Sequence, residues 1–249
     1  VQRDQFLDEM IMANIETLRI LGRAIAGRDD DTGRHDSRVT LYAVRLAEAI
    51  GVDDQTMRHL IMGAFLHDVG KIAVPDRILL KAGPLSPEEW EAMKSHVTMG
   101  VEILAKCKGC GWMHEAIEVV RFHHERFDGT GYPSGRAALA IPLNARIFAI
   151  ADVFDALTSA RPYKDRIPFG PAVMEMRSQR NRHFDPDLLD AFCEVARELY
   201  DRYADEDDET LARDVDRVIA RYFADRSLDN PKPGCMSSRG LNSGASGPM

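Results

Sequence analysis

Leu66-His67-Asp68-Val69-Gly70-Lys71 is the stretch around which the rest of this sequence can be ordered. An adjacent His and Asp occur by chance in many proteins, so the pair alone indicates little. Its weight comes from further imidazole and carboxylate groups on both sides of it. These are His35, His96, His123, His124 and Asp152. Such ligands, with no thiolate among them, suit iron, manganese, nickel or zinc in an open catalytic site. The sequence therefore predicts a metal centre that holds more than one ion.

The composition is that of one folded domain with an added arm. Of the 249 residues, 45% are apolar and 29% charged, which is ordinary for a globular protein. A net charge of −8 argues against broad binding to polymeric nucleic acid or to an anionic membrane. An anionic substrate would then be held locally, by metals and a few placed cations.

The cysteines and the apolar runs indicate a protein of the cytoplasm. The four cysteines lack the density and spacing of a secreted disulfide scaffold. The pair Cys107 and Cys110 has no second CxxC to complete a zinc site, so we expect a loop there without a metal or redox role. No apolar run reaches the roughly 18 residues that span a bilayer. Because the first residue is not Met, we expect a sensor or receiver domain to precede this segment.

The first residues, 1–27, are predicted to form a helical arm. Between Asp4 and Gly27 one face repeats with the spacing four, three, four, three, four. Its members are Leu7, Ile11, Asn14, Leu18, Leu21 and Ile25. Two interpretations stay open: packing on the same chain, or a parallel dimer seam. The polar Asn14 favours the dimer, because such a residue fixes register in coiled coils.

Residues 28–226 are predicted to form an all-α domain, and residues 227–249 a disordered tail rich in Gly, Ser, Pro and Asn. No segment alternates with period two as a half-buried strand would. Ser86-Pro87-Glu88-Glu89 predicts a capped helix start that carries His96 about two and a half turns in. Asp185-Pro186 predicts a second capped start.

The segment from Ala145 to Leu157 is almost continuously apolar, which predicts a buried helix. Its two carboxylates, Asp152 and Asp155, need partners there, because a buried unpaired charge is costly. We expect metal coordination for Asp152 and hydrogen bonds or an ion pair for Asp155.

The ligand set suggests how two ions would be shared. Adjacent residues on a helix point about 100° apart, so His67 and Asp68 cannot serve one ion in the same way. Asp68 can bridge two ions, with His35, His67 and Asp152 nearer one of them and the remaining histidines nearer the other. Two cations roughly 3.5–4 Å apart activate a shared water and clamp a phosphoryl group.

Three cations are available to hold phosphate oxygens: Lys71, Arg161 and Lys164. Each could instead be an ordinary surface cation. The histidines His59, His114 and His183 are interpreted as ordinary core or surface residues.

Several stretches occur together in the order of a known family. They are Thr32-Gly33-Arg34-His35, His67-Asp68-Val69-Gly70-Lys71, His96, His123-His124-Glu125, Asp128-Gly129-Thr130-Gly131-Tyr132-Pro133, Ala151-Asp152 to Ser159, and Arg161-Pro162-Tyr163-Lys164. From about residue 20 to 195 the chain closely resembles the HD-GYP family, a branch of the HD-domain metal-dependent phosphohydrolases.

The resemblance implies an HD-domain helical bundle that hydrolyses cyclic di-GMP to pGpG, or onward to GMP, in second-messenger signalling. It implies two or three divalent ions, with iron or manganese favoured over zinc or nickel. The implied ligands are His35, His67, Asp68, His96, His123, His124 and Asp152. Asp68 and Lys71 would be catalytic, and Lys71, Arg161, Lys164 and the loop around Tyr132 would meet the substrate. Such domains are commonly dimeric through an N-terminal helix and follow a receiver or sensor domain.

Three positions depart from the family pattern. Asp31 stands where members with a third ion carry Glu, which makes it a doubtful third-metal ligand and favours two ions with a pGpG product. Ala137-Ala138 stands where a Gly is usual, and the residues offer no account of it. Asn181 also replaces a usual Gly, and Asn tolerates a left-handed backbone better than most residues.

Two rival functions remain. One is an HD hydrolase of another cyclic dinucleotide or nucleotide. The other is a non-catalytic cyclic di-GMP receptor or dimerising module. The presence of all seven central ligands argues against the receptor.

Overall fold

The computed structural model describes residues 2–28, 34–106, 114–159 and 166–223, except for the side chains of residues 2–10 and 114. Within these ranges the chain is helical and has no strand, only an isolated bridge between Arg180 and Phe184. The all-α prediction is confirmed. The α-helices are α1 (Gln2–Ala26), α2 (Arg34–Ile50), α3 (Asp54–Leu66), α4 (Asp76–Leu79), α5 (Pro87–Lys94), α6 (His96–Ala105), α7 (His114–Phe122), α8 (Leu143–Thr158), α9 (Phe169–Ser178), α10 (Pro186–Tyr203) and α11 (Asp208–Phe223), and the short 3₁₀ helices are η1 (Val69–Ala73) and η3 (Ala138–Ala140).

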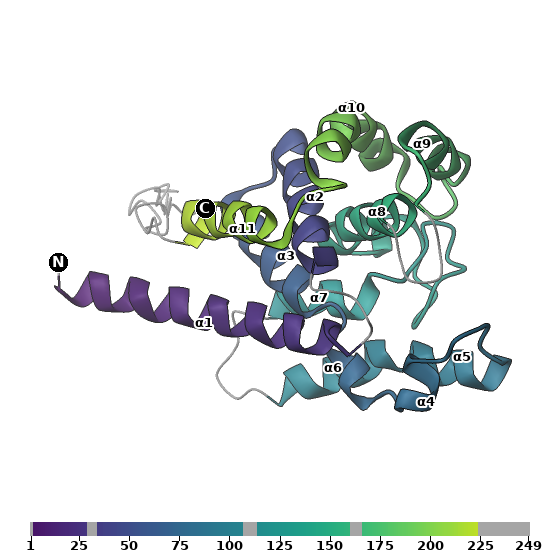
Figure 1. Ribbon diagram of the computed structural model, residues 1–249, viewed down its shortest axis with the longest axis horizontal. Coiled ribbons are helices and arrows are strands. Elements are labelled where there is room, and N and C mark those ends of the chain that lie inside the picture. The colour runs from purple at the N-terminus through teal and green to yellow at the C-terminus, as the bar shows by residue number, and fades with distance from the viewer. Residues whose placement is uncertain (1, 29–33, 107–113, 160–165, 224–249) are drawn as a thin grey trace, which may run out of the picture.

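The core surrounds α2, which runs through the middle of the bundle and contacts α3, α8, α10 and α11 (Figure 1). Tyr42 of α2 meets Phe154 of α8 edge to face at 5.3 Å, and Phe154 meets Phe192 of α10 at 5.0 Å. All three rings are fully buried. The prediction of a buried helix over 145–157 is confirmed, because α8 lines this core along most of its length.

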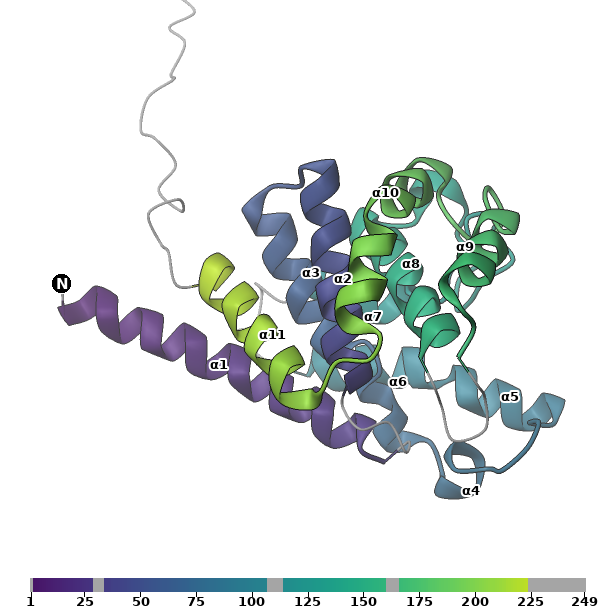
Figure 2. The ribbon, with the colours of Figure 1, turned by 45° about the horizontal axis from the view of Figure 1, so that its top comes forward.

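The arm α1 lies across the lower side of the bundle, with its first turns extending beyond it (Figures 1 and 2). Its later part packs on α3, η1 and α11. Gly22 allows the close approach, because a Cβ there would stand 2.1 Å from the carbonyl oxygen of Phe65. The helix therefore rests directly on the turn that precedes the His67-Asp68 pair.

Part of the heptad face of α1 packs against the same chain, and part of it is exposed. Ile25 is buried against its own chain, and Ile11 and Leu18 pack at the edge of the core. Asn14 and Leu21 are exposed, Leu21 by 38%. Packing on the same chain thus accounts for part of the face, and the exposed part carries no partner within the described residues.

Predicted helix starts are confirmed at both capped positions. Ser86 and Glu89 form the reciprocal capping box of α5, and Asp185 accepts from the first amides of α10. The prediction that His96 lies inside the first of these helices is wrong. α5 ends at Lys94, and His96 begins α6. Ser95 lies between them, and its hydroxyl donates to the Ala92 carbonyl, a local bond that competes with the helical ladder.

Among the described helices, none combines the length and the apolar character needed to cross a membrane. Five predicted features lie outside the described residues: Asp31, the Cys107–Cys110 pair, Arg161, Lys164 and the tail from 227.

Candidate metal centre

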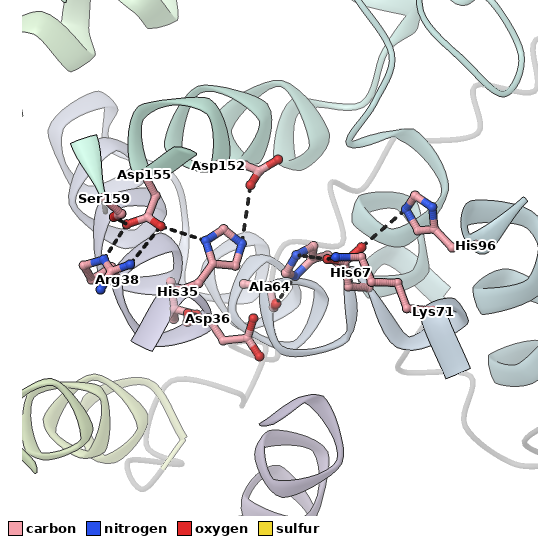
Figure 3. A network of polar contacts seen from close by, with 12 residues as sticks. His35, Asp36, Arg38, Ala64, His67, Lys71, His96, Asp152, Asp155 and Ser159 are labelled. Carbon is pink, nitrogen blue, oxygen red and sulfur yellow. Dashed lines mark hydrogen bonds and ion pairs between the residues drawn. The ribbon is translucent and has the colours of Figure 1, made fainter. Parts of the chain in front are cut away.

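All seven predicted ligands meet in one place, carried by five different segments. His35 is the second residue of α2, His67 and Asp68 follow α3, His96 opens α6, His123 and His124 follow α7, and Asp152 lies within α8. Ring centroids are 5.7 Å apart for His35 and His67, 5.5 Å for His67 and His123, 5.6 Å for His96 and His123, and 4.0 Å for His123 and His124. Asp152 Oδ1 lies 3.5 Å from His35 Nε2. Figure 3 shows the row from Asp152 through His35 and His67 to His96.

A glycine brings α6 against the central pair. A Cβ on Gly70 would stand 1.8 Å from the carbonyl oxygen of His96 and 2.5 Å from the amide nitrogen of Gly100. Only glycine fits such an approach without displacing a backbone. The Gly two residues after Asp68 therefore sets the distance between Asp68 and His96.

Three of the histidines are held by main-chain carbonyls. The Nδ1 of His67 lies 2.9 Å from the Ala64 oxygen, that of His96 lies 2.8 Å from the Met93 oxygen, and that of His123 lies 3.1 Å from the Val119 and Val120 oxygens. A carbonyl can only accept, so in each neutral ring Nδ1 carries the proton and donates it. The Nε2 of each ring is left with a lone pair, as in histidines that bind a metal.

Asp68 lies between the two halves of the cluster. One carboxylate oxygen, Oδ2, is 3.1 Å from His67 Nε2, and the other, Oδ1, is 3.3 Å from His96 Nε2. Lys71 Nζ is 2.9 Å from Oδ2. The two oxygens thus face different histidines, which is the arrangement that a bridging ligand needs.

The histidines differ in how their pKa values are shifted. Burial lowers the pKa of His123 well below its ordinary value, and the surrounding imidazoles add to the effect. Burial also lowers the pKa of His124 to about 4 and lowers that of His96. For His67, burial acts downward, but the surrounding carboxylates, Asp68 foremost, together outweigh it and raise the pKa to about 9. Neutral rings therefore prevail in the His96, His123 and His124 half, where they are ready to act as ligands.

A buried carboxylate orients His35 from behind. Asp155, fully buried in α8, lies 2.8 Å from His35 Nδ1, and this contact turns His35 Nε2 towards Asp152 (Figure 3). Arg38 donates to both oxygens of Asp155, at 2.5 and 3.1 Å, and the Ser159 hydroxyl donates at 2.9 Å. The expected hydrogen-bonded, ion-paired role of Asp155 is confirmed. Neither Arg38 nor Ser159 is predicted from the sequence to be its partner, although Ser159 stands in one of the matching motifs.

The loop after α7 folds around a buried glutamate that accepts hydrogen bonds from the loop's backbone amides. The buried Glu125 accepts from the amides of Ser134 and Arg136, at 2.7 and 3.1 Å. A Cβ on Gly131 would stand 2.3 Å from the amide nitrogen of Arg126. This glycine therefore serves the folding of the loop on itself. Tyr132, which forms a cis bond with Pro133, stacks on His124 at 4.8 Å and borders the cluster.

Both unusual non-glycine positions have left-handed backbones. Asn181 has a φ of 62°, as expected of an Asn that replaces Gly, and Ala138 has a φ of 49°. The second value explains why Gly is usual near this position, since Ala is strained in that region.

The other histidines do not join the cluster where the structure describes them. His59 lies 3.7 Å from Glu115, and His183 stacks on Phe184 at 4.4 Å. Asp36, which reasoning from the sequence did not select, is buried beside His35. Its carboxylate and the imidazoles of His35 and His67 offer ligand atoms within 4.8 Å of one another.

The residues present fit divalent metal ions. The Nε2 atoms of His96 and His123 are buried and accept no hydrogen bond from any described residue. Leaving such an acceptor unsatisfied costs about 1–3 kcal/mol, and a metal ion would satisfy both. His96, His123 and His124 also bring ligand atoms within 4.8 Å of one another. The site is therefore a candidate divalent-metal centre.

The chain is similar to known proteins of the HD-domain family. The family model for the HD domain matches residues 19–188. A cyclic di-GMP phosphodiesterase of Thermotoga maritima is 39% identical over 214 residues, which are 86% of this chain and 58% of that protein. A 3'3'-cGAMP-specific phosphodiesterase of Vibrio cholerae is 43% identical over 174 residues, 70% of this chain and 33% of that protein. The chain thus spans only part of each curated relative.

A solved structure shares the fold. The crystal structure of a cyclic GMP-AMP-specific phosphodiesterase of V. cholerae matches 83% of this chain and 55% of its own, with a TM-score of 0.61 at 16% identity. The helical bundle, the order of the motifs and the family match agree, and the chain belongs to the HD-domain family, in its HD-GYP branch.

Proposed function

We propose that this chain is the catalytic part of a metal-dependent phosphodiesterase that hydrolyses cyclic di-GMP. The observation that carries the proposal is the convergence of all seven predicted ligands around Asp68, whose two oxygens face different histidines. Relatives named for cyclic di-GMP are matched over 67–86% of the chain, and relatives named for 3'3'-cGAMP over 70–79%. We propose cyclic di-GMP, for which the relative matched over 86% is named, as the substrate and 3'3'-cGAMP as the alternative.

Two groups of side chains would hold the ions. His35, His67 and Asp152 would bind one, His96, His123 and His124 the other, and Asp68 both. When bound, two such ions supply an activated water and Lewis-acid stabilisation of a phosphoryl group. We propose iron or manganese, with zinc or nickel also compatible with these ligands. A third ion would need Asp31, and without it we expect the product pGpG and not GMP.

The remaining residues would bind and orient. Lys71 Nζ donates to Asp68, and beside the ions its positive charge would offset the negative charge of the phosphoryl group in the transition state. Asp155 and the main-chain carbonyls hold four of the imidazoles in one orientation, so little rearrangement is needed when ligands bind. Tyr132 would border the substrate. Arg161 and Lys164 are proposed as further phosphate contacts.

We also propose that the domain works within a larger assembly in the cytoplasm. The exposed Ile20 and Leu21 on α1 support a dimer through this helix, and an upstream receiver or sensor domain would be joined to it. Residues 1–27 would then be the linker to the domain over 28–226.

The test uses protein purified without chelators. Its metal content is measured, and it is incubated with cyclic di-GMP, 3'3'-cGAMP or cyclic di-AMP, with the products identified by mass spectrometry. We expect two ions per chain and conversion of cyclic di-GMP to pGpG, lost on chelation and restored by Mn²⁺ or Fe²⁺. His123→Ala should lose both metal and turnover. Metal-loaded protein that binds cyclic di-GMP without cutting it would instead support a receptor, and preference for 3'3'-cGAMP would change the substrate.

A further inference from the structure

An exposed tryptophan stands beside the metal centre on a helix with no buried residue. α5 is fixed by its capping box, and none of its side chains is buried. Trp90 is 47% exposed on it. Because a large aromatic side chain gains most from burial, its place on this short helix is not explained by the core.

A row of rings leads from the metal centre to this tryptophan. Tyr132 stacks on His124 at 4.8 Å, with 30° between the planes, and Trp90 meets Tyr132 at 6.3 Å, with 80° between the planes. Lys94 Nζ lies 5.6 Å from the Tyr132 ring. Trp90 is the outer member of the row, one ring beyond Tyr132, and about half of its surface is open to a ligand.

We propose that Trp90 stacks on a purine base of the cyclic dinucleotide while a phosphodiester lies at the metal centre. This inference rests on the proposed function and adds a residue that holds the substrate. A cyclic dinucleotide carries two bases on opposite sides of its sugar–phosphate ring. When one phosphate lies at the ions, a base can extend to the side chains beside the centre. Lys94 Nζ is paired with Glu91 at 2.7 Å. Because this pair offsets its charge, we assign Lys94 to the contact with Tyr132 and not to a second phosphate.

Stacking on the face of a base and hydrogen bonding to its edge differ in how their loss affects different substrates. Every purine presents a similar flat face, so a stacking residue holds guanine and adenine alike. Loss of Trp90 should then weaken cyclic di-GMP and 3'3'-cGAMP by a similar factor. A residue that reads the base edge by hydrogen bonds would weaken one of them selectively.

The experiment compares Trp90→Ala, Trp90→Phe and the control Met174→Ala in metal-loaded protein. Met174 is an exposed apolar side chain on α9, 73% exposed. For Trp90→Ala we expect the KM for both dinucleotides to rise about 5- to 150-fold, the range that base–aromatic stacking gives, with kcat and metal content retained. Trp90→Phe should recover most of the loss, and Met174→Ala should match the wild type.

A spectroscopic measurement reports the contact directly. The chain has two tryptophans, so Trp112→Phe leaves Trp90 as the sole indole. Saturating cyclic di-GMP should quench its emission, and inorganic phosphate should not.

The outcomes distinguish this inference from the function on which it rests. If wild-type protein turns over no cyclic dinucleotide, the proposed function fails first. If it turns them over and Trp90→Ala keeps KM within twofold, the stacking role alone is overturned. A fall in kcat together with metal loss would also overturn it, because Trp90 would then only support the fold.

Discussion

Replacing Asp155 by Asn would test how the structure orients His35. The substitution keeps the shape and one acceptor oxygen but removes a charge that Arg38 contacts through two hydrogen bonds. Removing one partner of a buried ion pair costs about 3–5 kcal/mol. We expect the unfolding free energy to fall by about 3 kcal/mol, at the lower end of that range, because the amide oxygen still accepts one bond.

The effect on metal binding should be confined to one half of the centre. Changing the residue that orients a ligating histidine costs about 10- to 100-fold in metal affinity. The ion held with His35 should weaken about 10-fold in Asp155→Asn and more in Asp155→Ala, because Ala offers no acceptor to His35 Nδ1. The ion held by His96, His123 and His124 should stay. Competition with a chelator, followed by metal analysis, measures the two affinities, and urea unfolding measures the stability.

Ser159→Ala provides the matched control. It removes a single hydrogen bond to the same carboxylate, so we expect a loss of about 1 kcal/mol in stability and no change in metal affinity. If Asp155→Asn binds both ions as the wild type does, Asp155 does not orient His35 for binding. If both ions weaken equally, the effect is not confined to His35 and the assignment also fails.

Three further changes test the loop, the close approach of α6 and the pH dependence. Ala138→Gly should stabilise the protein by about 0.5–1 kcal/mol in urea unfolding, because relief of the left-handed strain exceeds the entropy cost of glycine; no gain would contradict the strain. Gly70→Ala should cost about 1–3 kcal/mol and release metal, because its Cβ displaces the His96 carbonyl; unchanged metal content would argue against that contact. Burial alone would raise the pKa of Asp214, but the hydrogen bond from Arg202 helps to hold it below its ordinary value. The stabilisation that Asp214 contributes is therefore complete above the unfolded pKa of about 4 and is lost as pH falls through the folded pKa. In Asp214→Asn the free energy of unfolding should fall less steeply as the solution is acidified. An unchanged slope would show that Asp214 does not contribute to the acid sensitivity.

Local signals predicted the helices because their chemistry is local. Asp53, Ser86 and Asp185 each cap a helix through a side chain that accepts from an amide two or three residues on. The break between α5 and α6 was missed, since Ser95 is neither Gly nor Pro. What fixes the position of α6 there is the contact between His96 and Gly70, which are 26 positions apart in the sequence.

The candidate ligands could be selected by residue type, but the residues that hold them could not. Histidine and aspartate are common metal ligands, so their recurrence in such a set indicates metal binding before the fold is known. Arg38 is an ordinary helical cation until Asp155, 117 residues away, is placed beside it. Trp90 is likewise an exposed aromatic until the loop that carries Tyr132 folds against it. The partner decides the role in both cases, and only the fold supplies the partner.

The helix ends explain how the histidines are oriented without dedicated side chains. The last four carbonyls of an α-helix have no partner within the helix. The Ala64, Met93 and Val120 carbonyls belong to the last turns of α3, α5 and α7, and each lies three residues before the histidine it holds. Each of these histidines thus donates through Nδ1 to a carbonyl at the end of a helix, and its Nε2 is left to bind a ligand. Because the acceptor is main chain, no residue type marks it in the sequence; its signature is the position of a histidine just beyond a helix end. His35 lies in the first turn of its helix, and the acceptor for its Nδ1 is the side-chain carboxylate of Asp155 in place of a main-chain carbonyl.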